Sequence, residues 1–243
     1  MTAKLAPQAA LLRDFTVSFL TAHDGEVGKR IFAEDYSLDI SGIRLAGRDT
    51  HYLPATLEQL DQFPGLCVTA HDAVFSPDAV ALRFTEHGVS AREGKLSSWG
   101  GITLFRIEDG RLKQGWAEED YFARKLQLRS GSVNPILAPH PGPWDLTVEE
   151  NDGATEQAAR NWLAQLSAPL AATDEISAGG PRLASLVTPS SIEISMLFTA
   201  GRRAAFHAAI KGTYAGGFED VAAQAIGAEV ILPISGILDI EDG

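Results

Sequence analysis

The sequence predicts an α+β fold made of two tandem cone-shaped domains, each a curved, mostly antiparallel sheet wrapped around helices, with the second domain shortened. Three observations lead to this prediction. The segment SLDISGIRLAGR at residues 37–48 recurs with mild substitutions as SIEISMLFTAGR at residues 191–202. A helical pattern precedes each copy of the segment, and a run of alternating strands follows the first copy.

The first copy begins with a predicted helix, in which Leu12, Phe15 and Phe19 follow helical spacing. The repeated segment then alternates apolar and polar residues, as a half-buried strand does. A short amphipathic helix is expected within residues 50–66, and the following CVTAHDAVF, residues 67–75, has the composition of a strand.

Three further strands are predicted in this half of the chain. The alternation at residues 80–85 indicates the first of them, and GGITLFRI and RLKQGWAEED indicate the other two. The tripeptide Glu108-Asp109-Gly110 lies between these last two segments, and Asp-Gly between β-like runs is a strong hairpin signal. Long antiparallel strands after helices predict a sheet curved around an apolar interior.

The domain boundaries follow from proline content and from the repeat. Residues 131–153 contain four prolines and are predicted to be a Pro/Gly-rich linker between domains at residues 1–130 and 154–243. The sequence IEDG at residues 107–110 recurs at residues 240–243, where no counterpart of the strand RLKQGWAEED follows. We therefore expect the second domain to be a degenerate copy that packs on the first as an internal pseudo-dimer, with a homodimer as the alternative.

The second domain also begins with a helical pattern, formed by Trp162, Leu163, Leu166 and Leu170. Pro169 is expected to bend or end this helix.

Composition and charge exclude several classes of partner. The net charge is −12 and the basic residues are scattered, so nucleic acid is not an expected partner. Neither a signal peptide nor a run of ~20 apolar residues occurs, which predicts no membrane association and a cytoplasmic location. Cys67 is alone, and no HExxH, GxGxxG or P-loop motif occurs. We therefore expect neither a metal nor a cofactor.

Several motifs of the first half resemble those of SnoaL-like polyketide cyclases, which share the nuclear-transport-factor-like cone fold. They are Ala46-Gly47-Arg48, Phe63-Pro64, the strand around Arg83 and GITLFRIEDGRLKQGWAEED, which ends at Asp120. The resemblance covers about residues 8–130 and is weaker in the second half. It implies a deep pocket for a hydrophobic small molecule, between the sheet and the helices.

The resemblance also implies a catalytic carboxylate. Cyclases of this family use an Asp on the late strand to move protons during an intramolecular aldol ring closure, and Asp120 falls at that position. Many members carry a pocket histidine on the preceding hairpin, and His87 is its nearest counterpart here, at a shifted position. An aldol closure, isomerisation or dehydration of a hydrophobic carbonyl compound needs a base and a donor for the enolate oxygen. Further residues expected to line the pocket are Tyr36, Tyr52, His71 and Trp99.

Each of these assignments has a structural alternative. Asp120 directly precedes YFARKLQL and could instead be a helix N-cap that accepts from the N–H of Phe122 or Ala123. His71 could be a satisfied structural side chain, and Tyr52 could serve packing alone. Glu118 and Glu119 are expected to form a solvated acidic edge. The alternatives to an enzyme are a non-catalytic binding module that uses the same pocket and a structural protein whose cone is filled by its own side chains.

Overall fold

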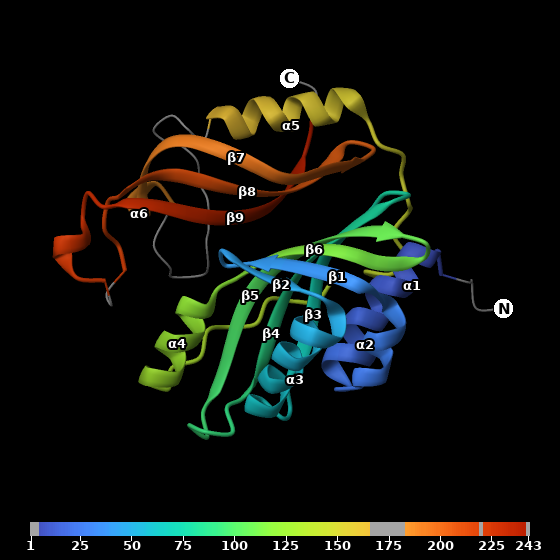
Figure 1. The fold of residues 1–243 in the computed structure, drawn as a ribbon, viewed down its shortest axis with the longest axis horizontal. Coiled ribbons are helices and arrows are strands. Elements are labelled where there is room, and N and C mark those ends of the chain that lie inside the picture. The colour runs from blue at the N-terminus through green and yellow to red at the C-terminus, as the bar shows by residue number, and fades with distance from the viewer. Residues whose placement is uncertain (1–4, 166–182, 219–220, 242–243) are drawn as a thin grey trace. The chain divides into compact units, whose positions relative to one another are not determined.

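The computed structural model describes residues 5–165, 183–218 and 221–241, and the chain divides into two compact units (Figure 1). Unit 1 spans Met1–Asn151 and unit 2 spans Asp152–Gly243. The elements of unit 1 are α1 (Pro7–Arg13), the π-helix η1 (Asp14–Thr21), α2 (Gly25–Ile31), β1 (Phe32–Ile40), β2 (Ile43–Ala46), the π-helix η2 (Arg48–Tyr52), α3 (Leu53–Gln62), β3 (Cys67–Phe75), β4 (Ala79–Val89), β5 (Leu96–Glu108), β6 (Arg111–Glu119) and α4 (Tyr121–Ser130). The elements of unit 2 are α5 (Gly153–Gln165), α6 (Leu183–Leu186), β7 (Val187–Ala200), β8 (Arg203–Tyr214), the 3₁₀-helix η3 (Ala223–Ala225) and β9 (Glu229–Asp239). Among the described helices, none combines the length and apolar content that crossing a bilayer requires.

Unit 1 is built on a six-stranded sheet with the strand order β2-β1-β6-β5-β4-β3. Neighbouring strands are antiparallel, except for β1 and β6, which run parallel. Asp109 and Gly110 have φ angles of 49° and 69° and form the turn between β5 and β6, at the predicted Asp-Gly hairpin. The strand predicted from CVTAHDAVF coincides with β3. The predicted α+β class with a curved, mainly antiparallel sheet is confirmed.

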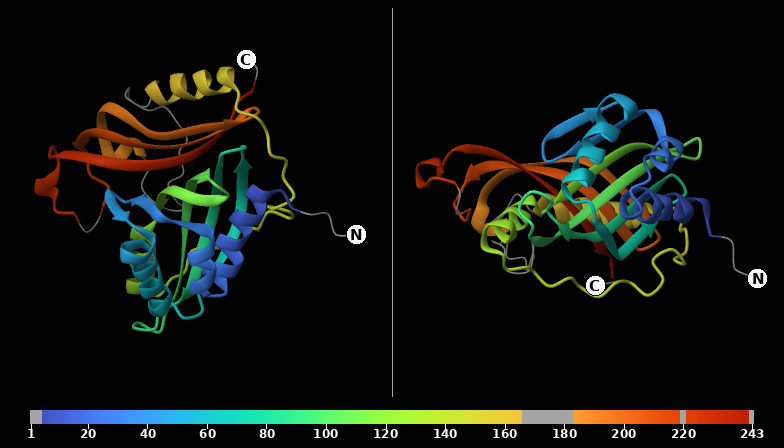
Figure 2. Two further views of the ribbon diagram at one scale, coloured as in Figure 1. Left: turned by 45° about the vertical axis from the view of Figure 1, so that its right-hand side comes forward. Right: turned by 90° about the horizontal axis from the view of Figure 1, so that it is seen from below.

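The N-terminal helices of unit 1 lie against one face of this sheet (Figure 2). That face is called the inner face here, and the opposite one the outer face. α1 and η1 follow each other without a break and bury Leu12, Phe15 and Phe19, as their spacing predicts. The ring of Phe15 meets the ring of Phe105 on β5 at a centroid distance of 4.9 Å. Aromatic side chains therefore fill much of the space between the helices and the inner face.

The repeated segment adopts different structures in its two copies. In unit 1 it is a hairpin of β1 and β2, which turns at Ser41 and Gly42 with φ angles of 50° and 77°. In unit 2 the aligned residues Ser195 and Met196 lie inside the single long strand β7, where only the register with β8 shifts. Glycine adopts positive φ without steric cost, whereas methionine does not. The replacement of Gly42 by Met196 thus accounts for the longer strand in the second copy.

Unit 2 is a three-stranded antiparallel sheet with the order β7-β8-β9. α5 packs on one of its faces through Leu163, which is fully buried against Phe206 and Ala208 of β8. The ring of Trp162 lies 6.1 Å from that of Phe206. The predicted helix is therefore present up to Gln165, whereas Leu166, Pro169 and Leu170 lie outside the described residues.

The segment predicted to be a linker packs along unit 1 as far as Asn151. The N–H of His140 donates to the carbonyl of Ala70, and that of Glu149 to the carbonyl of Phe75, so the segment follows β3 (Figure 2). Its side chains Trp144, Leu146 and Val148 are partly buried against the core of unit 1. The segment therefore completes the hydrophobic core of the first unit.

Candidate active site

Two glutamates and a tryptophan from three neighbouring strands meet on the inner face of unit 1. Glu86 on β4 lies opposite Trp99 on β5, and Gly101, two residues further along β5, lies opposite Glu119 on β6. Residues opposite each other, or two apart on a strand, share one face of a sheet. The indole N–H of Trp99 donates to Oε2 of Glu119 at 2.9 Å, and Trp99 also lowers the pKa of Glu86, which lies opposite it. Trp99 therefore lies between the two carboxyl groups, which we call the acidic pair.

A small residue makes room for this arrangement. A Cβ atom on Gly101 would lie 2.6 Å from Cζ of Phe84 and 2.9 Å from Cγ of Glu119. Any larger side chain at this position would displace the Glu119 side chain or the core ring of Phe84. Gly101 thus fixes where the second carboxyl group can lie.

Two helices complete the hydrogen bonding of the acidic pair. Gln59 of α3 donates from Nε2 to Oε2 of Glu86 at 2.9 Å. The hydroxyl of Tyr121, the first residue of α4, lowers the pKa of Glu119. Each carboxyl group therefore has a neutral polar neighbour of its own besides Trp99.

Arg124 supplies the positive charge near the acidic pair. Its guanidinium carbon lies 4.4 Å from the ring centroid of Tyr121, 5.0 Å from that of Trp99 and 5.6 Å from that of Phe63. The arginine thus stands among three aromatic rings, an arrangement that favours a cation. Its charge lowers the pKa of both Glu86 and Glu119, but it opposes two carboxylates with a single positive charge.

Burial dominates the electrostatics of the acidic pair. Glu86 is 2% exposed, and burial, followed by repulsion from Glu119, raises its pKa well above the ordinary value of a glutamate. Burial also raises the pKa of Glu119, against the hydrogen bonds from Trp99 and Tyr121. Two carboxyl groups that interact in this way titrate as a pair. The pair can therefore hold a proton at pH values at which an exposed glutamate is ionised.

Asp120, the predicted catalytic base, caps a helix in the structure. Its Oδ1 accepts from the backbone N–H of Ala123 at 2.8 Å, at the start of α4. This is the alternative that the sequence left open. The expectation of a solvated edge holds for Glu118, which accepts from Ser41, but is wrong for Glu119. Glu119 shares the inner face with Gly115 and Ala117, whereas Trp116 and Glu118 alternate to the outer face.

The two candidate histidines lie on the outer face of the sheet, away from the acidic pair. His87 contacts Oγ1 of Thr69 through Nε2 at 3.1 Å. His71 contacts Oγ1 of Thr85 through Nε2 at 2.8 Å and the carbonyl of Ala138 through Nδ1 at 3.0 Å. Burial lowers the pKa of both rings. Because His87 alternates with Glu86 along β4, it points to the other side of the sheet.

The two candidate tyrosines lie within the aromatic core. The rings of Tyr36 and Tyr52 are 4.7 Å apart, and each lies within 4.7 Å of the ring of Phe32. The charges of the acidic pair raise the pKa of Tyr52, after the larger effect of burial, so this ring lies near the pair. The hydroxyl of Tyr36 is buried without a hydrogen-bond partner among the described residues. Of the four predicted binding residues, Trp99 contacts the acidic pair directly.

A recess of about 450 Å³ opens beside α4. Tyr121 and Arg124 line it, whereas neither member of the acidic pair does. The other lining residues are Glu93, Lys125, Leu128 and Arg129. Within the part of the chain that the structure describes, no three His, Cys, Asp or Glu side chains are grouped to hold a metal ion.

Comparison with solved structures returns several proteins at low identity. IdmH of Streptomyces antibioticus, described as a candidate polyketide cyclase, is 18% identical over 50% of this chain and 98% of its own, with a TM-score of 0.45. A candidate SnoaL-like polyketide cyclase from Jannaschia sp. CCS1 is 14% identical over 53% of this chain and 95% of its own, with a TM-score of 0.48. An LEH-like epoxide hydrolase of M. tuberculosis is 15% identical over 53% of this chain and 94% of its own, with a TM-score of 0.45.

A family model gives the remaining match, and no curated protein matches the chain significantly. The model is that of the SnoaL-like domain and covers residues 12–114. This range includes Glu86 and Trp99 and ends before Glu119. The match supports the resemblance noted for the first half of the chain, whereas the second copy stays a prediction. Unit 1 of this chain is thus similar to SnoaL-like domains over residues 12–114.

Proposed function

We propose that unit 1 catalyses cofactor-independent proton transfer on a hydrophobic carbonyl or polyketide-like compound, in an aldol cyclisation, an isomerisation or a dehydration. The observation that carries this proposal is the acidic pair, in which Glu86 is buried, Glu119 is partly buried and Trp99 lies between them. A carboxyl group with a raised pKa is a stronger base when ionised and can donate a hydrogen bond when protonated. Both properties are needed to form and stabilise an enolate.

The chemistry divides between the two members of the pair. When they hold one proton, the ionised carboxylate accepts a proton from the carbon next to the substrate carbonyl. The electrons of that C–H bond then form the enolate, whose oxygen accepts a hydrogen bond from the protonated carboxyl group or from Tyr121. The abstracted proton returns to carbon in an isomerisation, or to the new alkoxide in an aldol closure. No external oxidant or reductant is needed.

The recess beside α4 supports access to this pair. It ends at Tyr121 and Arg124, and the cluster behind these side chains contains Leu60, Phe63 and Trp99. Four of the six residues that line the recess are charged, namely Glu93, Arg124, Lys125 and Arg129. A hydrophobic substrate would therefore have to contact the apolar cluster behind them, since small-molecule sites combine an apolar surface with a few polar groups.

The alternative function is a binding module that holds a similar compound without reaction. The predicted deep pocket is filled by Phe19, Phe32 and Tyr36, which are fully buried, and a filled interior favours the structural role over a binder that uses that pocket. Ligand contact would then be confined to the recess. The two functions differ in whether the bound carbonyl compound loses a proton.

Deuterium exchange separates them. We propose to follow the α-protons of 2-tetralone, a hydrophobic bicyclic ketone, by proton NMR in D₂O with wild type, Glu86→Gln and Glu118→Gln. Glu118→Gln is the matched control, since Glu118 lies one residue from the acidic pair and accepts from exposed Ser41. We expect exchange above the buffer rate for wild type and Glu118→Gln, and a loss of about 10²-fold or more for Glu86→Gln. Saturable binding of the ketone to wild type without exchange would establish the binding module instead.

A further inference from the structure

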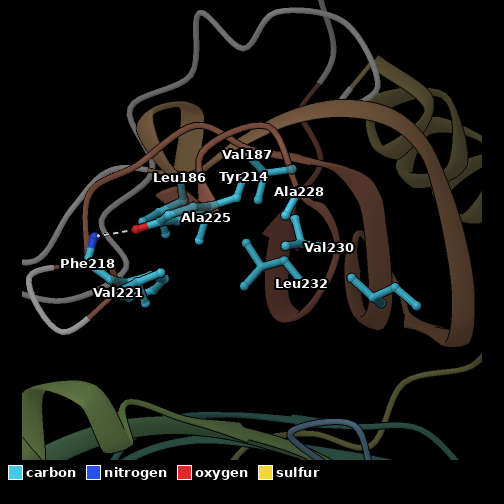
Figure 3. A pocket seen from close by; sticks show the side chains of 10 residues that line it. Leu186, Val187, Tyr214, Phe218, Val221, Ala225, Ala228, Val230 and Leu232 are labelled. Carbon is cyan, nitrogen blue, oxygen red and sulfur yellow. Dashed lines mark hydrogen bonds between the residues drawn. The ribbon is translucent and has the colours of Figure 1, made fainter. Parts of the chain in front are cut away.

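Unit 2 contains a cavity of about 220 Å³, separate from the acidic pair and from the aromatic interior of unit 1 (Figure 3). It lies where β7 begins and β8 ends. Val187 of β7, Tyr214 of β8 and Leu232 of β9 line it from the sheet, and Ala225 of η3 lines it from the segment that connects β8 to β9. The sequence had placed the candidate pocket in the first domain alone.

The lining of this cavity is apolar. None of its ten lining residues carries a charge, and the hydroxyl of Tyr214 is their only polar side-chain group. This hydroxyl already accepts from the backbone N–H of Phe218 at 3.0 Å, and the rings of Tyr214 and Phe218 are nearly parallel, 6.3 Å apart. Figure 3 shows this hydrogen bond at one end of the cavity. This hydrogen bond therefore positions Phe218 against Tyr214. The Tyr214 hydroxyl can offer a ligand only its own proton.

Large apolar side chains stay exposed around the same cavity. Val221 lines it and is 41% exposed, and the neighbouring Ile226 is 56% exposed. By contrast, Val187 at the base of the cavity is 5% exposed within a buried cluster with Leu186 and Ile210. An exposed apolar patch that is continuous with a cavity marks a place where a further apolar group can be buried. Because this patch lies beside a buried cluster, it differs from apolar side chains that are scattered singly over a protein surface.

We propose that this cavity is a binding site for a small, uncharged, apolar molecule, such as an aromatic compound of roughly ten non-hydrogen atoms. Size supports this class of ligand, because a cavity of ~150 Å³ lined by apolar side chains is enough to hold benzene. Charge supports it too, because an anion or cation in this cavity would lose its hydration without gaining an opposite charge from the lining. The site is independent of the proton-transfer function proposed for unit 1.

Fluorine NMR on the whole chain tests the site. The probe is (trifluoromethyl)benzene, which has about ten non-hydrogen atoms, and its charged analogue is 4-(trifluoromethyl)benzoate. We expect a saturable shift of the neutral probe and binding of the benzoate that is at least about tenfold weaker, because no lining residue offers the carboxylate a positive charge.

A pair of matched variants locates the bound probe. Ala225→Phe places a ring in the cavity, whereas Ala222→Phe makes the same change three residues earlier, at an exposed position outside the lining. We expect Ala225→Phe to weaken binding of the neutral probe at least about tenfold and Ala222→Phe to leave it unchanged, with both variants showing the wild-type melting transition. Equal binding by the two variants would place the probe elsewhere and overturn the proposal. An absence of saturable binding, together with a dimer that Ala225→Phe dissociates, would assign the patch to a second copy of the chain.

Discussion

The two faces of the sheet in unit 1 carry different polar groups for different purposes. On the inner face, buried Glu86 and partly buried Glu119 share one indole and one arginine as neighbours, so their charges are incompletely compensated. On the outer face, His71 and His87 contact threonine hydroxyls, and His71 also contacts a backbone carbonyl. The negative charges on the inner face are thus only partly neutralised, whereas the polar groups on the outer face form hydrogen bonds between strands. Incomplete compensation of this kind is typical of catalytic sites.

The largest expected effect contrasts two neighbouring acids at the end of β6. Glu119→Gln removes a member of the acidic pair, and we expect it to lower deuterium exchange of 2-tetralone by about 10²–10⁴-fold. Asp120→Asn retains an oxygen that can cap α4, and we expect less than about threefold change, since amides cap helices nearly as well as carboxylates. The exchange rates of the two purified variants, measured at one pH, check this contrast. A larger loss in Asp120→Asn would return the catalytic role to Asp120.

Alanine substitutions at two adjacent glycines of β5, Gly100 and Gly101, test how tightly the two faces of the sheet are packed. The Cβ atom of Gly101→Ala would meet Phe84 and Glu119 on the inner face, whereas that of Gly100→Ala would meet only the carbonyl of Phe84, at 3.8 Å. We expect Gly101→Ala to lower the free energy of unfolding by about 1–3 kcal/mol. Gly100→Ala is expected to change it by less than about 0.5 kcal/mol. Urea denaturation of both variants measures the difference, and equal stabilities would mean that the inner face is not tightly packed there.

The pH dependence of stability sharpens the contrast further. Because the pKa of Glu86 is raised in the folded state, its carboxyl group makes its full contribution to folding stability at pH values below the ordinary pKa of a glutamate. That contribution is lost as the pH rises through the raised value, at about 1.4 kcal/mol per unit of elevation. We therefore expect Glu86→Gln to be more stable than wild type at pH 8 and equally stable near pH 4. Thermal melts at both pH values check this, and an equal difference at the two would contradict a raised pKa.

The smallest expected effect concerns the cap of α4. Asp120→Ala removes the hydrogen bond from the N–H of Ala123, and we expect it to lower the free energy of unfolding by ~1 kcal/mol. Asp120→Asn should recover most of this loss. Chemical denaturation of the two variants provides the comparison. An unchanged stability of Asp120→Ala would show that the cap does not hold the helix that carries Tyr121 and Arg124.

Local signals in the sequence predicted much of unit 1. The spacing of Phe15 and Phe19, the Asp-Gly turn at residues 109–110 and the alternation of residues 67–75 each correspond to an element of the structure. In contrast, the two copies of the repeat look alike but differ in structure, because a single glycine, Gly42, permits the turn that Met196 replaces. The overall similarity of the twelve residues does not reveal this structural difference, which depends on the residue at position 42 or 196.

The acidic pair could not be predicted because it depends on which face of β6 lies inward. Gly115, Ala117 and Glu119 lie on the inner face, whereas Trp116 and Glu118 lie on the outer one. The small residues Gly115 and Ala117 indicate which face of β6 lies inward, because small side chains fit beneath helices whose aromatic rings fill the space. Glu86 carried no signal of its own, because its burial follows from pairing with Trp99 on the next strand.

We propose that Glu86 and Glu119 share a proton inside unit 1, which a titration of the glutamate side chains can show. Carbon NMR of the side-chain carboxyl groups, in protein labelled at glutamate, follows each glutamate from pH 3 to pH 9. We predict one carboxyl signal that titrates far above the ordinary glutamate value of ~4.3, and its disappearance in Glu86→Gln but not in Glu118→Gln. If every glutamate titrated near that ordinary value, the proposal of a shared proton would be wrong.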